Sequence, residues 1–369
     1  TGRPPAGEPD TGEPTGRSTR TEPRPGQSNT GRSRFRDPFF DNAKFLAIVL
    51  VVVGHALEPL RDIAAVHAVY LFLYMFHMPV FIVISGYLSR GFPSSGDKVQ
   101  KLVSQLLVPF LVFQLAYILF ARLDGKEPAL NLLDPYYLTW FLLALFAWRV
   151  STPLWQRLRW PLLVAVGICL VAGTQELVDE FEMGRVLSLL PFFVLGLRLK
   201  PEHFALLRKG WVRLLAVPTM LGGLVVAFWA HDRMSLDWVF WRSDNMTLQV
   251  DDATGTVMRL AMLVSATVLT TAFLALVPRR RYWFTALGTW TLYVYLLHGF
   301  AVKGATYAGL FDEPWIRTPL GHATVALAGV VLTLVLSSAP VRRLTRWAVE
   351  PPTDWVFRRP ARSRRRTTG

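Results

Sequence analysis

The chain is short of charge for its length and has a single cysteine. Only 18% of its 369 residues are charged, and Cys169 is the sole cysteine, whereas a soluble domain carries about 25% charged residues. One cysteine excludes an internal disulfide. The charges gather at the two ends and in short loops, so residues 39–340 form a series of apolar runs. A membrane-spanning helix needs about 20 such residues. The pattern therefore excludes a soluble core and predicts an all-α, polytopic membrane helix bundle.

Hydrophobic segments are also missing from the first 34 residues. We therefore expect no cleavable signal peptide there and expect the first span to act as an uncleaved anchor. Residues 1–34, rich in Gly, Pro, Ser, Thr and Arg, are predicted to be a disordered basic tail. Residues 346–369 are predicted to be a second basic tail, and residues 35–345 the transmembrane domain.

The net charge of +14 could indicate a nucleic-acid partner. Helices this apolar have no place in a soluble DNA-binding protein, so we predict the lipid bilayer and no nucleic acid as a partner. No P-loop, dinucleotide fingerprint or metal-ligand spacing occurs, and we expect no metal site.

About ten spans are predicted, and their connecting loops alternate in charge. The segments are about 38–57, 66–89, 101–121, 136–148, 160–174, 185–199, 212–230, 257–277, 284–305 and 319–338. Every second loop is rich in Lys and Arg, whereas the others contain acidic stretches. By the positive-inside rule, this alternation predicts a multi-pass protein of the cell membrane with both termini cytoplasmic.

The first span contains four ionisable residues, Asp41, Lys44, His55 and Glu58. At 100° per residue, Lys44 and His55 lie within about 20° of each other and about 16 Å apart along the axis. All four share one stripe, which is typical of a helix that lines a polar cavity. A charge in the membrane costs about 2.5–3.5 kcal/mol and usually has a function or a partner. The alternatives are an interfacial Asp41–Lys44 ion pair and a histidine that only packs.

Other spans also carry polar groups. In the second span, His77 lies near mid-membrane, and Ser85 precedes a glycine near its end; both could serve packing alone. In the ninth span, Tyr295 and His298 share a helical face and could extend a polar cavity or form structural hydrogen bonds. Arg185 and Arg259, at the outer ends of two further spans, could bind an acceptor sugar or its phosphate carrier, or extend to lipid headgroups.

The stretches RDPFFDNAKFLAIVLVVVGHALEPL and YLFLYMFHMPVFIVISGYLSRGF resemble the opening of the acyltransferase family 3 membrane proteins, and most of all their fucose 4-O-acetylase-like branch. That family has a basic residue, ten further residues and a histidine in its first span, which Lys44 and His55 match. FHMP and SGY at 76–79 and 85–87 match its second span. Weaker matches follow at 138–145, 190–197 and 292–300, so the resemblance covers about residues 34–340.

The chain departs from the family pattern at two positions. Lys44 stands where many relatives have Arg, which weakens an expectation of bidentate phosphate binding. Thr139 precedes Trp140 where Leu-Trp is commoner. No extracytoplasmic hydrolase-like domain is seen, so acyl transfer is expected within the membrane part.

The resemblance implies acyl-CoA, usually acetyl-CoA, as donor and a sugar or glycan as acceptor. His55 is expected to act as general base, because histidine titrates in the useful range, with Glu58 or His77 setting its tautomer. Lys44, Asp41, Arg36 and Ser85 are expected at the CoA site. The predicted acceptor residues are Trp140, Arg185, Arg259, Tyr295 and His298.

Two other classes of function stay open. One is a transporter or flippase of a small or lipid-linked glycan without acyl transfer. The other is a structural component of a glycan-assembly complex.

Overall fold

The computed structural model describes residues 1–2, 37–91, 102–175 and 180–351. Within these ranges every regular element is a helix and none is a strand, which confirms the predicted all-α class. Pro38 begins the helical unit that holds all of these elements. Arg36 and most of both predicted tails lie outside the described residues.

In the part of the chain that the structure describes, six helical segments are long and apolar enough to cross a membrane. They are α1 (Pro38–Leu57) with the 3₁₀ turn η1 (Glu58–Leu60), α2 (Ala64–Ser89), the π-helical turn η2 (Val103–Leu107) with α4 (Val108–Leu123), α10 (Gly210–Ala230), α12 (Asp252–Leu276) and α14 (Pro319–Leu336). The remaining α-helices are α5 (Trp140–Arg157), α6 (Pro161–Thr174), α7 (Met183–Ser188), α8 (Leu190–Arg198), α9 (Pro201–Leu206), α11 (Asp237–Phe240), α13 (Thr291–Tyr307) and α15 (Ala339–Val349). Three further 3₁₀ turns are η3 (Glu180–Glu182), η4 (Thr285–Thr289) and η5 (Leu310–Asp312).

The predicted count of ten spans is not confirmed when helices are judged by length and apolar composition. Each predicted segment nevertheless contains a helix. The segment predicted at 185–199 is divided into α7 and α8 at Leu189. The one at 284–305 begins as the 3₁₀ turn η4, leaving 17 residues for α13. Helix α6 has 14 residues, about 21 Å at 1.5 Å per residue, which is less than the hydrocarbon thickness of about 30 Å. Broken helices are tolerated at membrane depth where they line a cavity.

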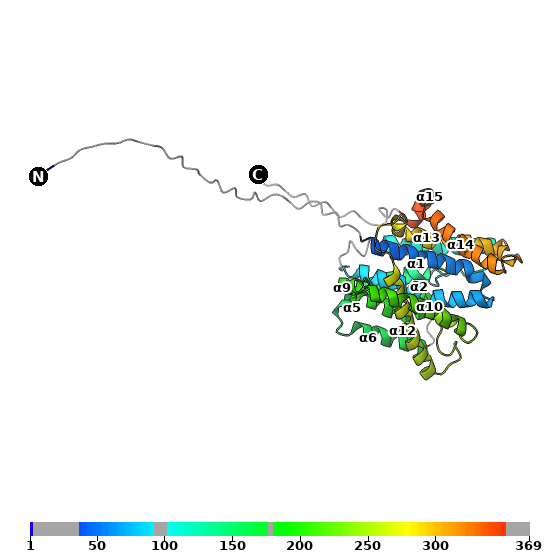
Figure 1. The fold of residues 1–369 in the computed structure, drawn as a ribbon. Coiled ribbons are helices and arrows are strands. Elements are labelled where there is room, and N and C mark those ends of the chain that lie inside the picture. The colour runs from blue at the N-terminus through cyan, green and yellow to red at the C-terminus, as the bar shows by residue number, and fades with distance from the viewer. Residues whose placement is uncertain (3–36, 92–101, 176–179, 352–369) are drawn as a thin grey trace. The chain divides into compact units, whose positions relative to one another are not determined.

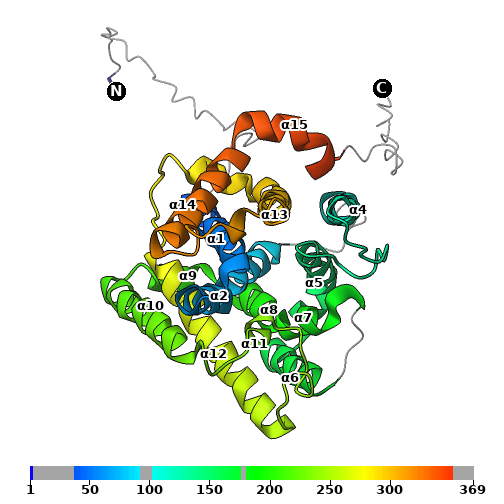
Figure 2. The same ribbon diagram turned by 90° about the vertical axis from the view of Figure 1, so that its right-hand side faces the viewer.

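Helices α1 and α2 run antiparallel through the centre of the bundle (Figures 1 and 2). The ring of Phe40, near the start of α1, stacks on that of Tyr87, near the end of α2, with centroids 4.9 Å apart. Helices α13 and α14 pack on α1, whereas α8, α10 and α12 pack on α2. Helices α1 and α2, which carry His55 and His77, are therefore neighbours at the centre of the bundle.

Glycines allow α2 and α8 to cross in close contact. A Cβ on Gly86 would lie 2.2 Å from the Phe193 carbonyl oxygen, and one on Gly196 would lie 2.2 Å from the Val83 carbonyl oxygen. Only glycine fits at such distances. The close helix approach expected near Ser85 is thus present at Gly86, while the expected role of Ser85 in donor binding stays a prediction.

The basic loops meet at one end of the bundle, around the beginning of α1. Asn42, which is fully buried, donates to the carbonyl oxygens of Pro278 and Arg280 at 2.8 and 2.9 Å. Arg90 donates to the carbonyl oxygen of Leu199 at 2.7 Å. The residue that follows α2 is therefore bonded to the residue that follows α8, and the loop after α12 is bonded to α1. We call this end the basic end.

The opposite end carries the turn after α1 and the loops 124–139 and 231–251. Charges of both signs occur there, and Asp62 forms an ion pair with Arg317 across two of the turns. The hydrogen bond from Arg317 lowers the pKa of the Asp62 carboxyl from its ordinary value. This end we call the mixed end. The loops that alternate in charge along the chain thus lie at opposite ends of the bundle, the basic loops at the basic end and the acidic stretches at the mixed end.

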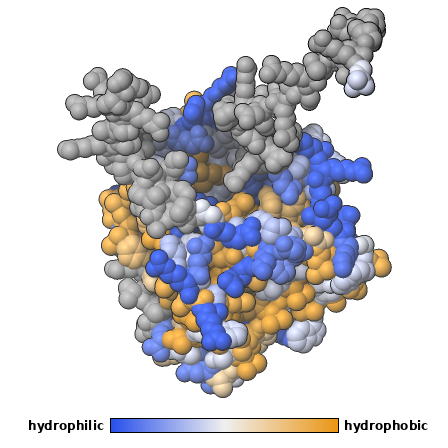
Figure 3. Space-filling model, turned by 90° about the vertical axis from the view of Figure 1, so that its left-hand side faces the viewer, coloured by the Kyte–Doolittle hydropathy of each residue, from blue (hydrophilic) through white to orange (hydrophobic). Residues whose placement is uncertain are grey.

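The outer surface is hydrophobic over wide areas. Leu214 and Val225 on α10 are 74% and 68% exposed, and on the face shown in Figure 3 hydrophobic residues lie beside and between the hydrophilic ones. Apolar helices with outward-facing apolar side chains suit a lipid environment. The protein is therefore a multi-pass membrane protein.

Candidate active site

A cavity of about 520 Å³ lies at the mixed end of the bundle. Its lining comes from α1, α2, α5, α7, α11, α13 and the loop before α5, so segments far apart in the sequence converge on it. Aromatic side chains form much of the wall, and ionisable side chains lie among them. The described lining includes His55, Glu58, Arg61, Tyr70, Tyr74, His77, Tyr136, Tyr137, Trp140, Glu182, Arg185, Asp237, Phe240, Trp241, Arg242 and Tyr295.

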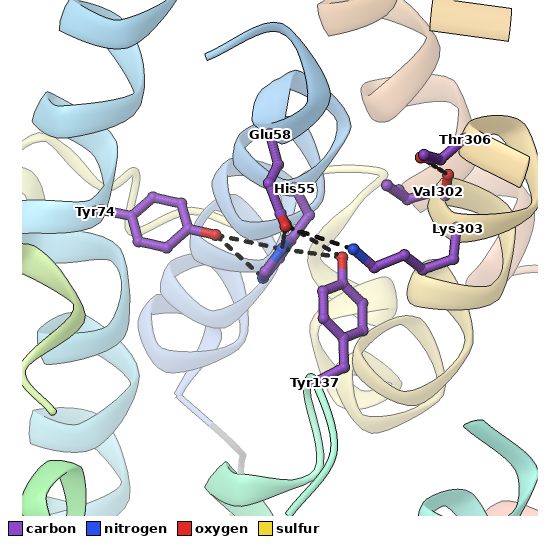
Figure 4. A network of polar contacts seen from close by, with 7 residues as sticks. All are labelled: His55, Glu58, Tyr74, Tyr137, Val302, Lys303 and Thr306. Atoms are coloured by element: carbon purple, nitrogen blue, oxygen red, sulfur yellow. Dashed lines mark hydrogen bonds and ion pairs between the residues drawn. The ribbon is translucent and has the colours of Figure 1, made fainter. Parts of the chain in front are cut away.

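His55 and Glu58 form the most connected polar group of the cavity (Figure 4). Nδ1 of His55 lies 3.0 Å from Oε2 of Glu58, the contact expected between residues three apart near the end of a helix. The side chains are only 13% and 20% exposed. Glu58 stands at the start of the η1 turn that ends α1, and this change of backbone brings its carboxylate back beside the imidazole.

Three further side chains surround this pair. The Tyr74 hydroxyl lies 3.2 Å from Nδ1 of His55, and the Tyr137 hydroxyl lies 3.3 Å from the same nitrogen. Tyr137 also donates to Oε2 of Glu58 at 3.4 Å. Lys303, on α13, places Nζ 3.5 Å from Oε1 of Glu58 and 4.3 Å from the centroid of the Tyr137 ring. The carboxylate is therefore contacted by a cation, a phenol and an imidazole.

The two other histidines predicted for the site lie close to this group. His77 lines the cavity, and its Nδ1 contacts the Leu73 carbonyl oxygen at 2.8 Å. The His298 ring centroid lies 5.3 Å from that of His55, and its Nδ1 contacts the Val294 carbonyl oxygen at 2.9 Å. Each imidazole thus uses one nitrogen on its own helix. Among the described residues no hydrogen bond joins His77 to His55, so Glu58 is better placed to set the His55 tautomer.

Trp140 and Arg185 form one wall of the cavity. The Arg185 guanidinium carbon lies 4.6 Å above the centroid of the Trp140 ring, a cation–π geometry. Nε of Arg185 donates to the Phe240 carbonyl oxygen at 2.9 Å, and NH1 lies 3.5 Å from the Glu182 carboxylate. Arg185 therefore lies inside the protein wall of the cavity rather than extending to headgroups.

Tyr295 also lines the cavity, and its hydroxyl donates to the carbonyl oxygen of Leu138. Arg259 lies elsewhere. It is 3% exposed, donates to the Ser243 carbonyl oxygen, and is not among the described residues that line the cavity. NH1 of Arg259 lies 3.4 Å from the Ser188 hydroxyl. The contact of Arg259 with the acceptor therefore stays a prediction. In the structure its guanidinium bonds to Ser188 and Ser243.

The predicted donor residues lie toward the basic end. Nζ of Lys44 lies 2.8 Å from Oδ1 of Asp41, so the Asp41–Lys44 ion pair considered from the sequence is present, whereas its place at the membrane interface stays a prediction. Neither residue belongs to the described lining of the cavity, which reaches along α1 to Val51. Val51 and Lys44 are seven positions apart, which is about 10 Å of helix. Ser85 lies on α2 beyond the described lining as well.

The sequence reasoning missed Tyr74, Tyr137 and Lys303. Tyr74 had a detectable signal, because it lies three residues before His77 and so shares its helical face. Lys303 is an ionisable residue late in the ninth predicted span. A charged residue within a span is the same signal that marks Lys44 in the first span. Tyr137 lies in a loop, where no periodicity marks a side chain that points inward. In the described residues no group of three or more His, Cys, Asp or Glu side chains is arranged to hold a metal ion.

Comparison with known proteins identifies the family of the chain. A family model described as an acyltransferase domain (acyltransferase 3) matches residues 37–342. The chain belongs to this acyltransferase family. The predicted membership of the acyltransferase 3 family is confirmed for this membrane protein.

Two curated relatives match parts of this chain. The nodulation protein NolL of Mesorhizobium japonicum is 42% identical over 83 residues, which are 21% of this chain and 22% of that protein. The nodulation protein NolL of Sinorhizobium fredii is 33% identical over 128 residues, 30% of this chain and 35% of that protein. The chain thus aligns with about a fifth to a third of the length of these relatives. No solved structure gives a significant match.

Proposed function

We propose that this acyltransferase moves an acetyl group from acetyl-CoA to a hydroxyl of a sugar or cell-surface glycan. The observation that supports it best is the His55–Glu58 pair, held at 3.0 Å in the wall of an aromatic cavity. An alcohol needs a base to remove its proton when it attacks a thioester. An imidazole oriented by a carboxylate is the usual protein solution.

The geometry suggests a role for each nitrogen of His55. If Nδ1–H donates to Glu58, Nε2 carries the lone pair and accepts the proton of the acceptor hydroxyl. The hydroxyl oxygen then bonds to the thioester carbonyl carbon, the carbon–sulfur bond breaks, and His55 returns its proton to the CoA thiolate. Glu58 stabilises the imidazolium in between, and Lys303 balances the charge of Glu58.

The cavity lining suits a sugar. Aromatic rings, such as those of Trp140 and Tyr70, and polar groups, such as those of Arg185 and Asp237, line the cavity together. Ligand sites combine these two features, with typical volumes of about 300–1,000 Å³. The volume of about 520 Å³ lies within this range and leaves room for more than the hydroxyl group that reacts.

The separation of charge between the two ends supports a sidedness for the reaction. Positively charged loops mark the cytoplasmic side, so we place the basic end, with Lys44, and both chain termini in the cytoplasm. The cavity then opens to the extracytoplasmic side, where the acceptor arrives. Acetyl-CoA binds from the cytoplasm near Lys44 and Asp41, and its pantetheine arm covers the roughly 16 Å of helix between Lys44 and His55.

The test is transfer of labelled acetyl from acetyl-CoA to glycans extracted from cell envelopes, with membranes that contain equal amounts of each variant. His55→Ala is expected to abolish transfer, whereas His203→Ala, on α9 at the basic end, keeps it. Mass spectrometry of the glycans is expected to show one added acetyl mass per modified sugar. Wild-type transfer by His55→Ala contradicts the proposal. Glycan movement across the membrane without consumption of acetyl-CoA favours a flippase instead.

A further inference from the structure

The loop that carries Tyr137 is held by one buried side chain, Gln114 on α4. Gln114 is 0% exposed. Its Nε2 donates to the carbonyl oxygens of Asn131 and Asp134 at 3.1 and 2.7 Å. Its Oε1 accepts from the Tyr136 backbone N–H at 2.8 Å and from the Thr139 hydroxyl at 2.7 Å. Both amide atoms therefore make two hydrogen bonds, the full capacity of this side chain.

All four bonds go to residues 131–139, which are separated from Gln114 by 17 to 25 positions. Such a loop lacks the ladder of hydrogen bonds that orders a helix, so its conformation depends on side chains of this kind. On the other flank, the Tyr295 hydroxyl donates to the Leu138 carbonyl oxygen. The loop is thus fastened on both sides of Tyr137 by buried groups from α4 and α13.

Tyr137 itself has a backbone conformation that needs such support. Its φ angle is 58°, in the left-handed region that residues other than glycine seldom occupy. Strain of this kind persists only where surrounding contacts enforce it, and it often accompanies functional sites. Here it directs the phenol inward, where its hydroxyl contacts Nδ1 of His55 at 3.3 Å and Oε2 of Glu58 at 3.4 Å.

We propose that Gln114 is a positioning residue for acyl transfer, which acts through Tyr137 on the His55–Glu58 pair. The inference rests on the proposed function, since it assigns a part in that reaction. The chain of contacts runs from the buried amide to the strained loop, from the loop to the phenol, and from the phenol to the base and its carboxylate. Gln114 contacts neither His55 nor Glu58 in the described structure, so its effect on the reaction requires Tyr137.

A double-mutant cycle with the full-length protein tests this dependence. The rate of acetyl transfer from labelled acetyl-CoA to envelope glycans is measured for the wild type, Gln114→Met, Tyr137→Phe and the double variant. Tyr137→Phe removes a hydrogen bond to a charged group, so kcat is expected to fall about 10- to 100-fold. Gln114→Met is expected to lower kcat about tenfold through misplacement of the phenol. The KM for acetyl-CoA is expected to stay within about twofold in both, because neither residue lies at the proposed donor site.

The decisive comparison is the effect of Gln114→Met in the Tyr137→Phe background. If Gln114 acts through the hydroxyl, the double variant is about as active as Tyr137→Phe alone. An equal loss in both backgrounds, as expected for independent sites, means that Gln114 only stabilises the fold and overturns the inference. Full activity of Tyr137→Phe overturns it as well.

Two further variants guard against a failure to fold. Thr139→Val removes only one of the four bonds to Gln114 and is expected to give a smaller loss of kcat with the same dependence on Tyr137. Gln156→Met is the matched control, because Gln156 is exposed at the basic end and makes one bond, to the Arg90 carbonyl oxygen at 2.9 Å; it is expected to be fully active. If the wild type itself transfers no more acetyl than His55→Ala, both the proposed function and this inference fall.

Discussion

Replacement of Glu58 by glutamine isolates what the carboxylate contributes to His55. The change keeps the shape of the side chain and removes its charge. Oε2 of Glu58 now lies 3.0 Å from Nδ1 of His55, and the two side chains are at most 20% exposed. A hydrogen bond to a charged group contributes about 1.5–3 kcal/mol. At 1.36 kcal/mol for each factor of ten, its loss lowers the rate about 10- to 150-fold.

A change in the tautomer of His55 adds to this loss of rate. An amide nitrogen at the position of Oε2 donates to Nδ1, which forces the hydrogen of His55 onto Nε2, the nitrogen needed as base. A comparable change in serine proteases lowers kcat about 10⁴-fold. We therefore expect Glu58→Gln to reduce kcat by a factor between about 10 and 10⁴, with little change in the KM for acetyl-CoA.

The assay is initial-rate transfer of labelled acetyl to envelope glycans in membranes with equal amounts of protein. Glu127→Gln, in the exposed loop after α4, is the matched control and is expected to keep full activity. A Glu58→Gln variant that retains more than half of the wild-type kcat would refute the assignment of Glu58 as the partner of the base.

Two further predictions follow from neighbouring contacts. Lys303→Met removes the cation 3.5 Å from Glu58 and is expected to lower kcat about tenfold in the same assay. Lys303→Arg keeps the charge and is expected to retain most of the wild-type kcat. Equal losses in both variants would argue against a role of the charge. Gly86→Ala introduces a Cβ at 2.2 Å from the Phe193 carbonyl oxygen and is expected to destabilise the protein by about 1–3 kcal/mol. Gly222→Ala meets no atom within 4 Å, so thermal unfolding in detergent should separate the two variants, and similar melting temperatures would contradict the close crossing of α2 and α8.

The sequence alone determined the class of the fold and the helix on which we propose the catalytic base. Apolar runs of spanning length predicted an all-helical membrane protein, because hydrocarbon forbids unsatisfied backbone groups. The 3.6-residue period placed Lys44, His55 and Glu58 on one stripe of α1. Pairing of His55 with Glu58, and of Asp41 with Lys44, followed from their separation by three residues and is present in the structure.

The number of membrane-spanning helices could not be predicted from hydropathy. Hydropathy measures composition over a window, and it cannot detect that a run is divided, as at Leu189 between α7 and α8. Such division depends on tertiary packing around a cavity, where backbone groups find partners other than those of a regular helix. The predicted ten spans therefore include segments that are helical but too short to cross a membrane alone.

Tertiary structure alone decided which distant residues join His55. Lys303 and Tyr137 lie 248 and 82 residues along the chain from it, and no local period relates positions so far apart. Tyr137 reaches the site from a loop that is bonded to Gln114 and Tyr295, and Tyr137 itself has a left-handed conformation. Local spacing can specify neighbours within one helix, whereas contacts between helices and loops arise from packing, which no single stretch of sequence encodes.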